Sequence, residues 1–305
     1  MQFPRRVLLT GARGFVGRHL TAVLGQRFPG VVLVAEWFDV TDPDATLRAV
    51  RDAAPDSCIH LAGITAVPDA QKRGDAAWQV NLHGTLNLAR AILSAAPQSR
   101  FLHVSTSEVY GRSFIDGRAL DETAALAPMN TYAATKAAAD LAVGAMVSDG
   151  LRAVRLRPFN HVGPGQSDAF VVAALAHQLT RVEAGLQAPV LQVGALTPRR
   201  DFLDVRDVCA AYASCLEQTD AALPAGSVLN IASGVARSIG DVLARMCEIM
   251  DLKVELVTDP QRLRPVEIAV AQGDAGRARA LLGWKPLYSW DQTLHDVIAD
   301  WRGRI

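Results

Sequence analysis

Short, continuously apolar runs of strand length recur along the first half of the chain. Continuous rather than alternating hydrophobicity is typical of strands that are buried on both faces of a sheet. These runs lie at residues 5–10, 31–35, 58–63, 100–106 and 152–158. Segments with apolar residues at helical spacing separate them, among them 15–26, 76–94 and 132–147. The alternation predicts an α/β fold built on a Rossmann-type doubly wound parallel sheet.

The pattern changes after Pro158. "FNHVGPGQ" at 159–166 has the glycines and proline of a loop, and a long amphipathic helix is predicted over 170–184. The segment 198–212, "PRRDFLDVRDVCAAY", is interpreted as a loop that returns to a helix.

A second, smaller domain is therefore expected. "SVLNIAS" at 227–233 has the pattern of one more strand of the main sheet. We expect a larger Rossmann domain of residues 1–158 plus about 199–231. The remainder, about 159–198 and 232–305, would form a discontinuous C-terminal substrate domain over the open end of the sheet.

Charge and length exclude several classes of partner. Lys plus Arg and Asp plus Glu each number 31 in the 305 residues, so no basic excess would attract nucleic acid or an anionic membrane. No apolar stretch approaches the roughly 20 residues that a membrane-spanning helix needs. The N-terminus leads directly into a strand, without the features of a signal peptide. We expect a cytoplasmic protein that binds neither nucleic acid nor membrane.

The cysteines and histidines do not suggest a metal site. The four cysteines show no Cys-x-x-Cys pair, and the seven histidines show no His-x-x-x-His pair. Reduced, structural thiols are the best interpretation of Cys58, Cys209, Cys215 and Cys247. No metal is expected.

A glycine-rich turn follows the first predicted strand. "TGARGFVG" places Gly11, Gly14 and Gly17 between a strand and a helix. Small residues allow a tight turn and a close approach of the backbone to a pyrophosphate, which the N–H groups of the helix N-terminus can bind. Because the strand and the helix stand on the correct sides, the turn predicts a dinucleotide site.

The sequence leaves the choice between NADH and NADPH open. An acid that contacts the adenosine ribose is expected after the second strand, and Glu36 and Asp39 are candidates. Glu36 would bind ribose hydroxyls and repel a phosphate, which favours NAD. Arg13 in the glycine turn could pair with that phosphate, which favours NADP.

"YAATK" supplies a candidate reducing centre. Tyr132 and Lys136 are four residues apart at the start of a helix, hence on one face. A nearby ammonium and an oxidised nicotinamide would lower the pKa of the phenol from about 10, so that Tyr132 can exchange a proton with a sugar oxygen. Thr106, at the end of a strand, can hydrogen-bond the same oxygen.

Together these motifs resemble the extended short-chain dehydrogenase/reductase family, in the branch that modifies nucleotide sugars. "TGARGFVG", "HLAG", "NLHGTLNL", "STSEVYG", "YAATK" and "LLGWKP" occur in the family's order. "RPFNHVGPGQ", "RRDFLDVRDV" and "RLRPVEI" are most similar to the GDP-6-deoxy-D-mannose reductase family. That family reduces the 4-keto group of GDP-4-keto-6-deoxy-D-mannose to GDP-D-rhamnose with NADPH or NADH.

The resemblance implies roles for further residues. Asp39 and Val40 would border the adenine, and Asn160 would contact the sugar diphosphate. Arg200 and Arg264 would bind nucleotide phosphate or ribose, although from the residues alone a surface ion pair, for instance of Arg200 with Asp201 or Asp204, is the preferred interpretation. The remaining implied contacts are Phe15, Val16, Leu61, Ala62, Gly63 and Pro158 for the cofactor, and Ser107 and Glu267 for the substrate. A homodimer is implied as well.

Glu108 separates two reactions within the family. Thr106-Ser107-Glu108 matches the Thr-x-Glu pattern in which the glutamate of the GDP-mannose 4,6-dehydratase removes a proton beside a transient ketone. A reductase needs no such base, and there Glu108 would position a sugar hydroxyl. The loop "RPFNHVGPGQ" and the short chain favour the reductase. The alternatives are the dehydratase or another nucleotide-sugar epimerase or dehydratase, and more remotely a non-catalytic cofactor sensor, which intact Tyr132 and Lys136 disfavour.

Overall fold

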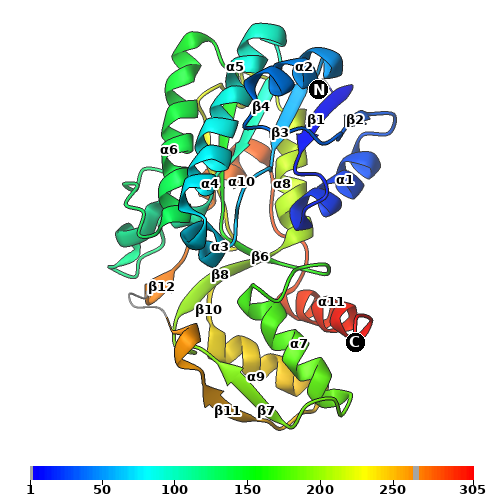
Figure 1. Cartoon of the computed structure of the whole chain (residues 1–305), viewed down its shortest axis with the longest axis vertical. Helices are drawn as coiled ribbons and strands as arrows, with labels where there is room; N and C mark the ends of the chain where they lie inside the picture. Colours follow the sequence, from blue (N-terminus) through cyan, green and yellow to red (C-terminus); the bar gives the residue numbers. More distant parts are fainter. Residues whose placement is uncertain (1–2, 264–267) are drawn as a thin grey trace.

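The computed structural model describes residues 3–263 and 268–305, and it is built on a six-stranded parallel sheet (Figure 1). The strand order is β2-β1-β3-β4-β5-β9, which confirms the predicted Rossmann-type sheet. The strands are β1 Arg6–Thr10, β2 Val32–Val34, β3 Ser57–His60, β4 Arg100–Val104, β5 Ala153–Pro158 and β9 Val228–Ile231. Their carboxyl ends meet at one edge, and the Gly11, Leu61 and Thr106 segments follow there.

Helices cover both faces of this sheet. On one face, α1 Phe15–Arg27 packs against α8 Val205–Glu217, and both contribute to the largest hydrophobic core. The other face is covered by α2 Pro43–Ala53, α5 Thr85–Ala95 and α6 Thr131–Ala145 (Figure 1). Continuous hydrophobicity of the strands follows from this double coverage.

The helix predicted over 76–94 is interrupted. It consists of α4 Gly74–Trp78, a π-helical turn at Gln79–Gly84, and α5. π-Helical turns widen a helix by one residue and occur often near functional sites. This one lies between the segment at Val40 and the helix that carries Tyr132, as the contacts below show.

A second, smaller sheet lies across the carboxyl edge of the first (Figure 1). Its strands are β6 Asn160–Val162, β8 Arg199–Asp204, β10 Ala236–Ser238 and β12 Val270–Ala271. The interpretation of the start of 198–212 as a loop is wrong, because Arg199–Asp204 forms β8 at the centre of this sheet. Strand β8 lies in the segment 199–231 that was assigned to the larger domain, yet it pairs with the smaller sheet.

The rest of the chain completes this second layer. Helices α7 Val171–Glu183, α9 Ile239–Met250 and α11 Trp290–Arg302 share a separate hydrophobic core. A parallel pair of strands, β7 Val190–Val193 and β11 Glu255–Thr258, lies beside them. Two short helices pack against the elements of the main sheet region: α3 Val67–Lys72 contacts α6, and α10 Gly276–Leu282 contacts β9 and α8. The two-domain division itself stays a prediction.

Candidate active site

The glycine turn has the close packing that the motif predicts. Gly11 has φ +73°, and its carbonyl oxygen accepts a hydrogen bond of 3.0 Å from the amide of Gly14. A Cβ on Gly17 would lie 2.3 Å from Gly11 O, and one on Gly11 would lie 2.8 Å from the amide nitrogen of Ala62. Both distances are far below van der Waals contact, so side chains are excluded here.

The start of α1 offers backbone donors to an anion. Gly14 is the N-cap, and no side chain caps the helix. Uncapped N–H groups at a helix N-terminus, beside a turn without side chains, are the donor set that a pyrophosphate requires. The residues present therefore fit a dinucleotide. Arg13 is exposed, whereas Phe15 and Val16 are half-buried at the first helical turn.

The two acids predicted to contact the adenosine ribose differ in their local hydrogen bonds. Asp39 Oδ1 accepts hydrogen bonds from the amide (2.9 Å) and hydroxyl (2.8 Å) of Thr41, which lower the pKa of Asp39. Glu36, just beyond β2, is exposed. Val40 is buried against Gly84, where a Cβ would come within 2.6 Å of Val40 Cγ2. Glu36 and Asp39 are both exposed, and Asp39 is the one held by hydrogen bonds from Thr41.

Asn81, which the sequence analysis did not identify, fixes the segment after β3. Its Oδ1 accepts from the amide of Ile64 (2.8 Å), and its Nδ2 donates to Ile64 O (3.0 Å) and to Thr135 Oγ1 (3.0 Å). Leu61, Ala62 and Gly63 precede this clamp. Asn81 therefore links the predicted cofactor-lining loop to α6, through the π-helical turn that no sequence pattern had indicated.

Tyr132 and Thr106 are brought together. Tyr132 is 9% exposed, and Thr106 is 8% exposed at the end of β4. Burial raises the pKa of Tyr132 to about 12, a hydrogen bond with the Thr106 side chain opposes this rise, and the charge of Glu108 adds to it. The two side chains therefore lie within hydrogen-bonding reach, and the phenol is protonated at neutral pH, while their catalytic roles stay predictions.

The expected lowering of the Tyr132 pKa is wrong for the free protein. Lys136 is buried four residues along α6, but its Nζ donates to Val104 O over 2.6 Å. Burial lowers the pKa of Lys136 to about 8, and the carboxylate of Asp140 opposes that shift. Burial of the phenol dominates its pKa, so Tyr132 keeps its proton at neutral pH in the protein alone.

Glu108 lies within the same group of residues. The amide of Glu108 donates to Thr106 Oγ1 over 3.2 Å, so Thr106 caps the short 3₁₀ segment Ser107–Phe114. Asn130 Nδ2 donates to Glu108 Oε2 over 3.3 Å. Asn130, which the sequence analysis missed, directly precedes "TYAATK" and is the N-cap of α6. Asparagine is a preferred N-cap residue, so its place before this helix could have been predicted from the sequence.

Three predicted substrate or cofactor positions follow the carboxyl ends of neighbouring strands. Pro158 ends β5, Asn160 begins β6 with an exposed side chain, and Ser107 is buried beside Thr106. The structure thus gathers these positions at the edge where the glycine turn also lies. Their roles stay predictions.

The "RRDFLDVRDV" segment is largely structural. Asp201 accepts hydrogen bonds from Ser233 and from the amides of Gly234 and Gly273, whereas Asp204 binds Arg206. Arg200 Nη1 donates to Ile268 O over 2.8 Å. The two carboxylates that might have paired with Arg200 are therefore bound by other groups. Arg264 and Glu267 lie outside the described residues, so the structure does not place them.

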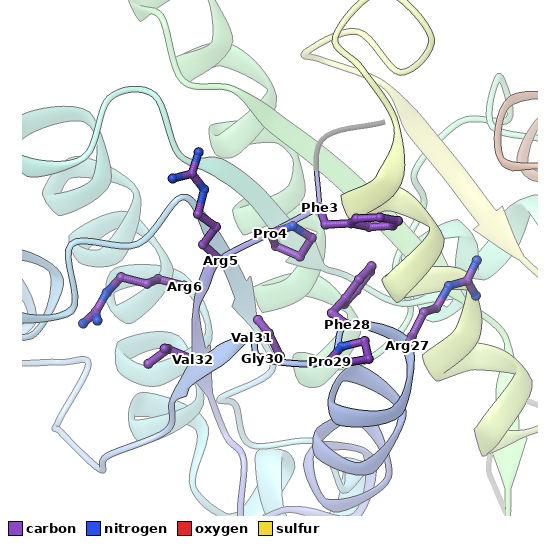
Figure 2. Close-up of a pocket in the computed structure, with 10 residues that line it drawn as sticks. All are labelled: Phe3, Pro4, Arg5, Arg6, Arg27, Phe28, Pro29, Gly30, Val31 and Val32. Carbon is purple, nitrogen blue, oxygen red and sulfur yellow. The ribbon is translucent and has the colours of Figure 1, made fainter.

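A separate cavity of about 530 Å³ lies at the opposite edge, by the amino ends of β1 and β2 (Figure 2). The rings of Phe3 and Phe28 are tilted against each other there, with their centroids 5.8 Å apart, and the Arg5, Arg6 and Arg27 side chains extend outward (Figure 2). The strands separate this cavity from Tyr132, so it is not part of the candidate active site.

Residues 3–263 and 268–305 contain neither a metal-binding cluster nor a helix that could span a membrane. No group of three or more histidine, cysteine or acidic side chains there is placed to hold a metal ion. None of the helices in that part of the chain has the length and hydrophobicity needed to cross a membrane.

A family model described as GDP-mannose 4,6 dehydratase matches residues 31–297. Among curated proteins, the GDP-6-deoxy-D-mannose reductase of Pseudomonas aeruginosa is 38% identical over 304 residues, covering 99% of this chain and 98% of the relative. The similarity therefore extends over both sheets and the whole candidate site.

Solved structures agree in fold. The structure of RMD from Pseudomonas aeruginosa complexed with NADPH has a TM-score of 0.89 and 36% identity, covering 98% of this chain and 100% of that one. The UDP-glucose 4-epimerase of Thermus thermophilus, complexed with NAD, has a TM-score of 0.84 and 26% identity, covering 98% and 100%. Both cofactors are thus bound by proteins of this architecture.

Proposed function

The chain belongs to the extended short-chain dehydrogenase/reductase family, and we propose that it is an NAD(P)H-dependent reductase of a GDP-linked keto-deoxy sugar. The proposed reaction reduces the 4-keto group of GDP-4-keto-6-deoxy-D-mannose to GDP-D-rhamnose. Full-length similarity to a GDP-6-deoxy-D-mannose reductase supports this substrate. The structural observation that carries the proposal is the buried pair of Tyr132 and Thr106, in which the phenol keeps its proton at neutral pH.

The roles of these residues follow from their chemistry. When bound, the reduced nicotinamide supplies the hydride. Tyr132 donates its proton to the ketone oxygen, and the Thr106 hydroxyl hydrogen-bonds the same oxygen and orients it. The pKa of about 12 holds the proton on Tyr132 until negative charge develops on the substrate oxygen.

Lys136 has a second role in this proposal. At pH values below about 8, its buried ammonium is charged, because its pKa is lowered only to that value. A positive charge one helical turn from Tyr132 stabilises the phenolate that remains after proton donation. Val104 O holds the ammonium in place.

Glu108 acts as a positioning group in the proposed reductase. Its carboxylate already accepts a hydrogen bond from Asn130 and raises the pKa of Tyr132, which favours a protonated donor. The second candidate is a GDP-mannose 4,6-dehydratase, in which Glu108 would remove the proton. The match to the model of that family and the Thr106-Ser107-Glu108 pattern support it.

We propose that substrate is held between the two sheets. Asn160, at the start of β6, would contact the sugar diphosphate, and Arg200 on β8 would contribute a guanidinium. NADPH or NADH would lie along Gly11–Gly17. We also propose, on the family resemblance alone, that the protein is cytoplasmic and forms a homodimer. Sedimentation equilibrium would test the homodimer.

The direct test supplies purified protein with GDP-4-keto-6-deoxymannose plus NADPH or NADH, and separately with GDP-mannose plus NADP or NAD. Oxidation of the reduced cofactor only with the ketosugar supports the reductase and names its cofactor. Ketosugar formed from GDP-mannose without net cofactor change would overturn it in favour of the dehydratase.

A further inference from the structure

A row of polar side chains crosses the buried centre of the main sheet. Its members lie opposite one another in register on β1, β3, β4 and β5: Thr10, His60, His103 and Arg155. The row two residues earlier is apolar: Leu8, Cys58, Phe101 and Ala153. Interiors of parallel sheets are normally apolar on both faces, so a polar row at this place requires an explanation.

Most members of the row have partners. His60 Nδ1 and Thr10 Oγ1 are 2.7 Å apart, and His60 Nε2 and Thr85 Oγ1 are 3.0 Å apart. At the other end, Arg155 Nη1 donates to Asp140 Oδ1 over 3.1 Å. The contact of His60 with Thr85 joins β3 to α5, and the contact of Arg155 with Asp140 joins β5 to α6.

His103 is different. Its side chain is 0% exposed, and neither ring nitrogen has a hydrogen-bond partner among the described residues. The neighbouring Arg155 Nε is likewise buried and unpartnered within that part of the chain. Buried polar atoms nearly always bind protein groups or ordered water, and several on one side of a sheet mark a polar site.

Two charged groups of α6 lie by this site: Asp140, which binds Arg155, and Lys136. The Nζ of Lys136 donates a hydrogen bond of 2.6 Å to the carbonyl oxygen of Val104, the residue after His103. An ammonium has three donors, and Val104 O takes one of them. The ring centroids of His60 and His103 lie 6.2 Å apart, and the charge of Lys136 lowers the pKa of both imidazoles.

We propose that an ordered water joins Lys136 Nζ to the imidazole of His103, with Arg155 Nε as a further donor, so that His103 positions the Lys136 ammonium. His103 does not touch substrate and acts only through Lys136. The row then supports the reducing centre from the interior of the main sheet.

The charge state of His103 suits this role. Burial and the charges of Lys136, His60 and Arg155 hold the pKa of His103 well below its ordinary value, so the ring is neutral and can accept a hydrogen bond. The groups that face it are His60 from β3, Arg155 from β5, and Lys136 and Asp140 from α6. An acceptor there favours the charged form of Lys136.

The test titrates Lys136 itself. The chain has four lysines, at 72, 136, 253 and 285, so ¹³Cε-lysine NMR gives few signals, and Lys136→Arg assigns the one of interest. The cofactor-free protein is used without substrate. Although the inference rests on the proposed function for the role of Lys136, its failure is then distinguishable from failure of that function.

Wild-type Lys136 is expected to titrate near pH 8. His103→Phe and His103→Leu, which remove the acceptor at two different volumes, should each move that midpoint down by about one pH unit, and either folded variant suffices. His103→Gln, which keeps an acceptor, should stay close to wild type. Phe101→Leu, a change of ring packing on the same face of β4, should leave it unmoved.

Three results would overturn the proposal. An unchanged midpoint in a folded His103→Phe or His103→Leu variant would show that Lys136 does not depend on His103. An equal shift in His103→Gln or in Phe101→Leu would assign the effect to packing rather than to hydrogen bonding.

Discussion

The side-chain amide of Asn130 connects Glu108 to the helix that carries Tyr132. Its nitrogen donates to Glu108 Oε2 over 3.3 Å, and its oxygen accepts from the amide of Ala133, the third residue of α6, over 2.8 Å. One residue therefore sets both the start of α6 and the place of the carboxylate. The position of Glu108 relative to Tyr132 is fixed by this link, whichever reaction the carboxylate serves.

Glu108→Gln separates the two candidate reactions. Glutamine keeps an oxygen that can accept from Asn130 but cannot remove a proton. The reductase should keep its rate within about tenfold, because it loses only a positioning charge. The measurement is kcat with the ketosugar and reduced cofactor. A loss of roughly 10²-fold or more would contradict the positioning role and indicate a base.

Tyr132→Phe removes the proton donor without changing the shape of the side chain. We expect turnover to fall by about 10²–10⁴-fold, the usual contribution of a positioned acid. Cofactor affinity and the circular dichroism spectrum should match wild type. Steady-state kinetics and fluorescence titration with NADPH measure these quantities, and near-normal turnover would refute the proposed donor.

Gly17→Ala tests the cofactor turn, with Gly25→Ala as the matched control in the same helix. A Cβ at 17 would lie 2.3 Å from Gly11 O, whereas one at 25 has nothing within 4 Å. Gly17→Ala should distort the turn at a cost of about 1–3 kcal/mol and weaken cofactor binding about tenfold or more. Gly25→Ala should stabilise α1 by about 1 kcal/mol. Calorimetric Kd and Tm measure both, and equal effects would contradict the packing argument.

Arg13→Ala and Glu36→Gln should change cofactor choice in opposite directions. Both side chains are exposed beside the predicted adenosine ribose. Losing the guanidinium removes a partner for a ribose phosphate, so KM for NADPH should rise about tenfold while KM for NADH stays constant. Losing the Glu36 charge should weaken NADH and improve NADPH. Parallel changes for the two cofactors would contradict this placement of the phosphate.

Local patterns predicted the main features of the fold and much of the site. The glycine turn, the strands and "YAATK" are short, contiguous signals, and Tyr132 and Thr106 do meet. Strand β8 was missed because its polar "RRD" start resembles a loop. Only tertiary contacts reveal that Asp201 is buried and bound by Ser233, Gly234 and Gly273.

The features that sequence could not supply depend on distant partners. Asn81 was overlooked because its clamp on Ile64 and Thr135 depends on a π-helical turn, which leaves no mark in residue spacing. In the protein alone the pKa of Tyr132 is raised rather than lowered, which the sequence did not predict because helical spacing shows that Lys136 is near, but not that its Nζ binds Val104 O or that the phenol is buried.

The most direct test of the proposed reaction follows the hydride. The protein is incubated with GDP-4-keto-6-deoxymannose and NADPH or NADH deuterated at both C4 positions of the nicotinamide, and the sugar product is analysed by NMR. A reductase places one deuterium at C4 of the deoxyhexose for each cofactor oxidised, and the couplings there identify the rhamno configuration. A product without deuterium at C4, or no cofactor oxidation with this substrate, would contradict the account.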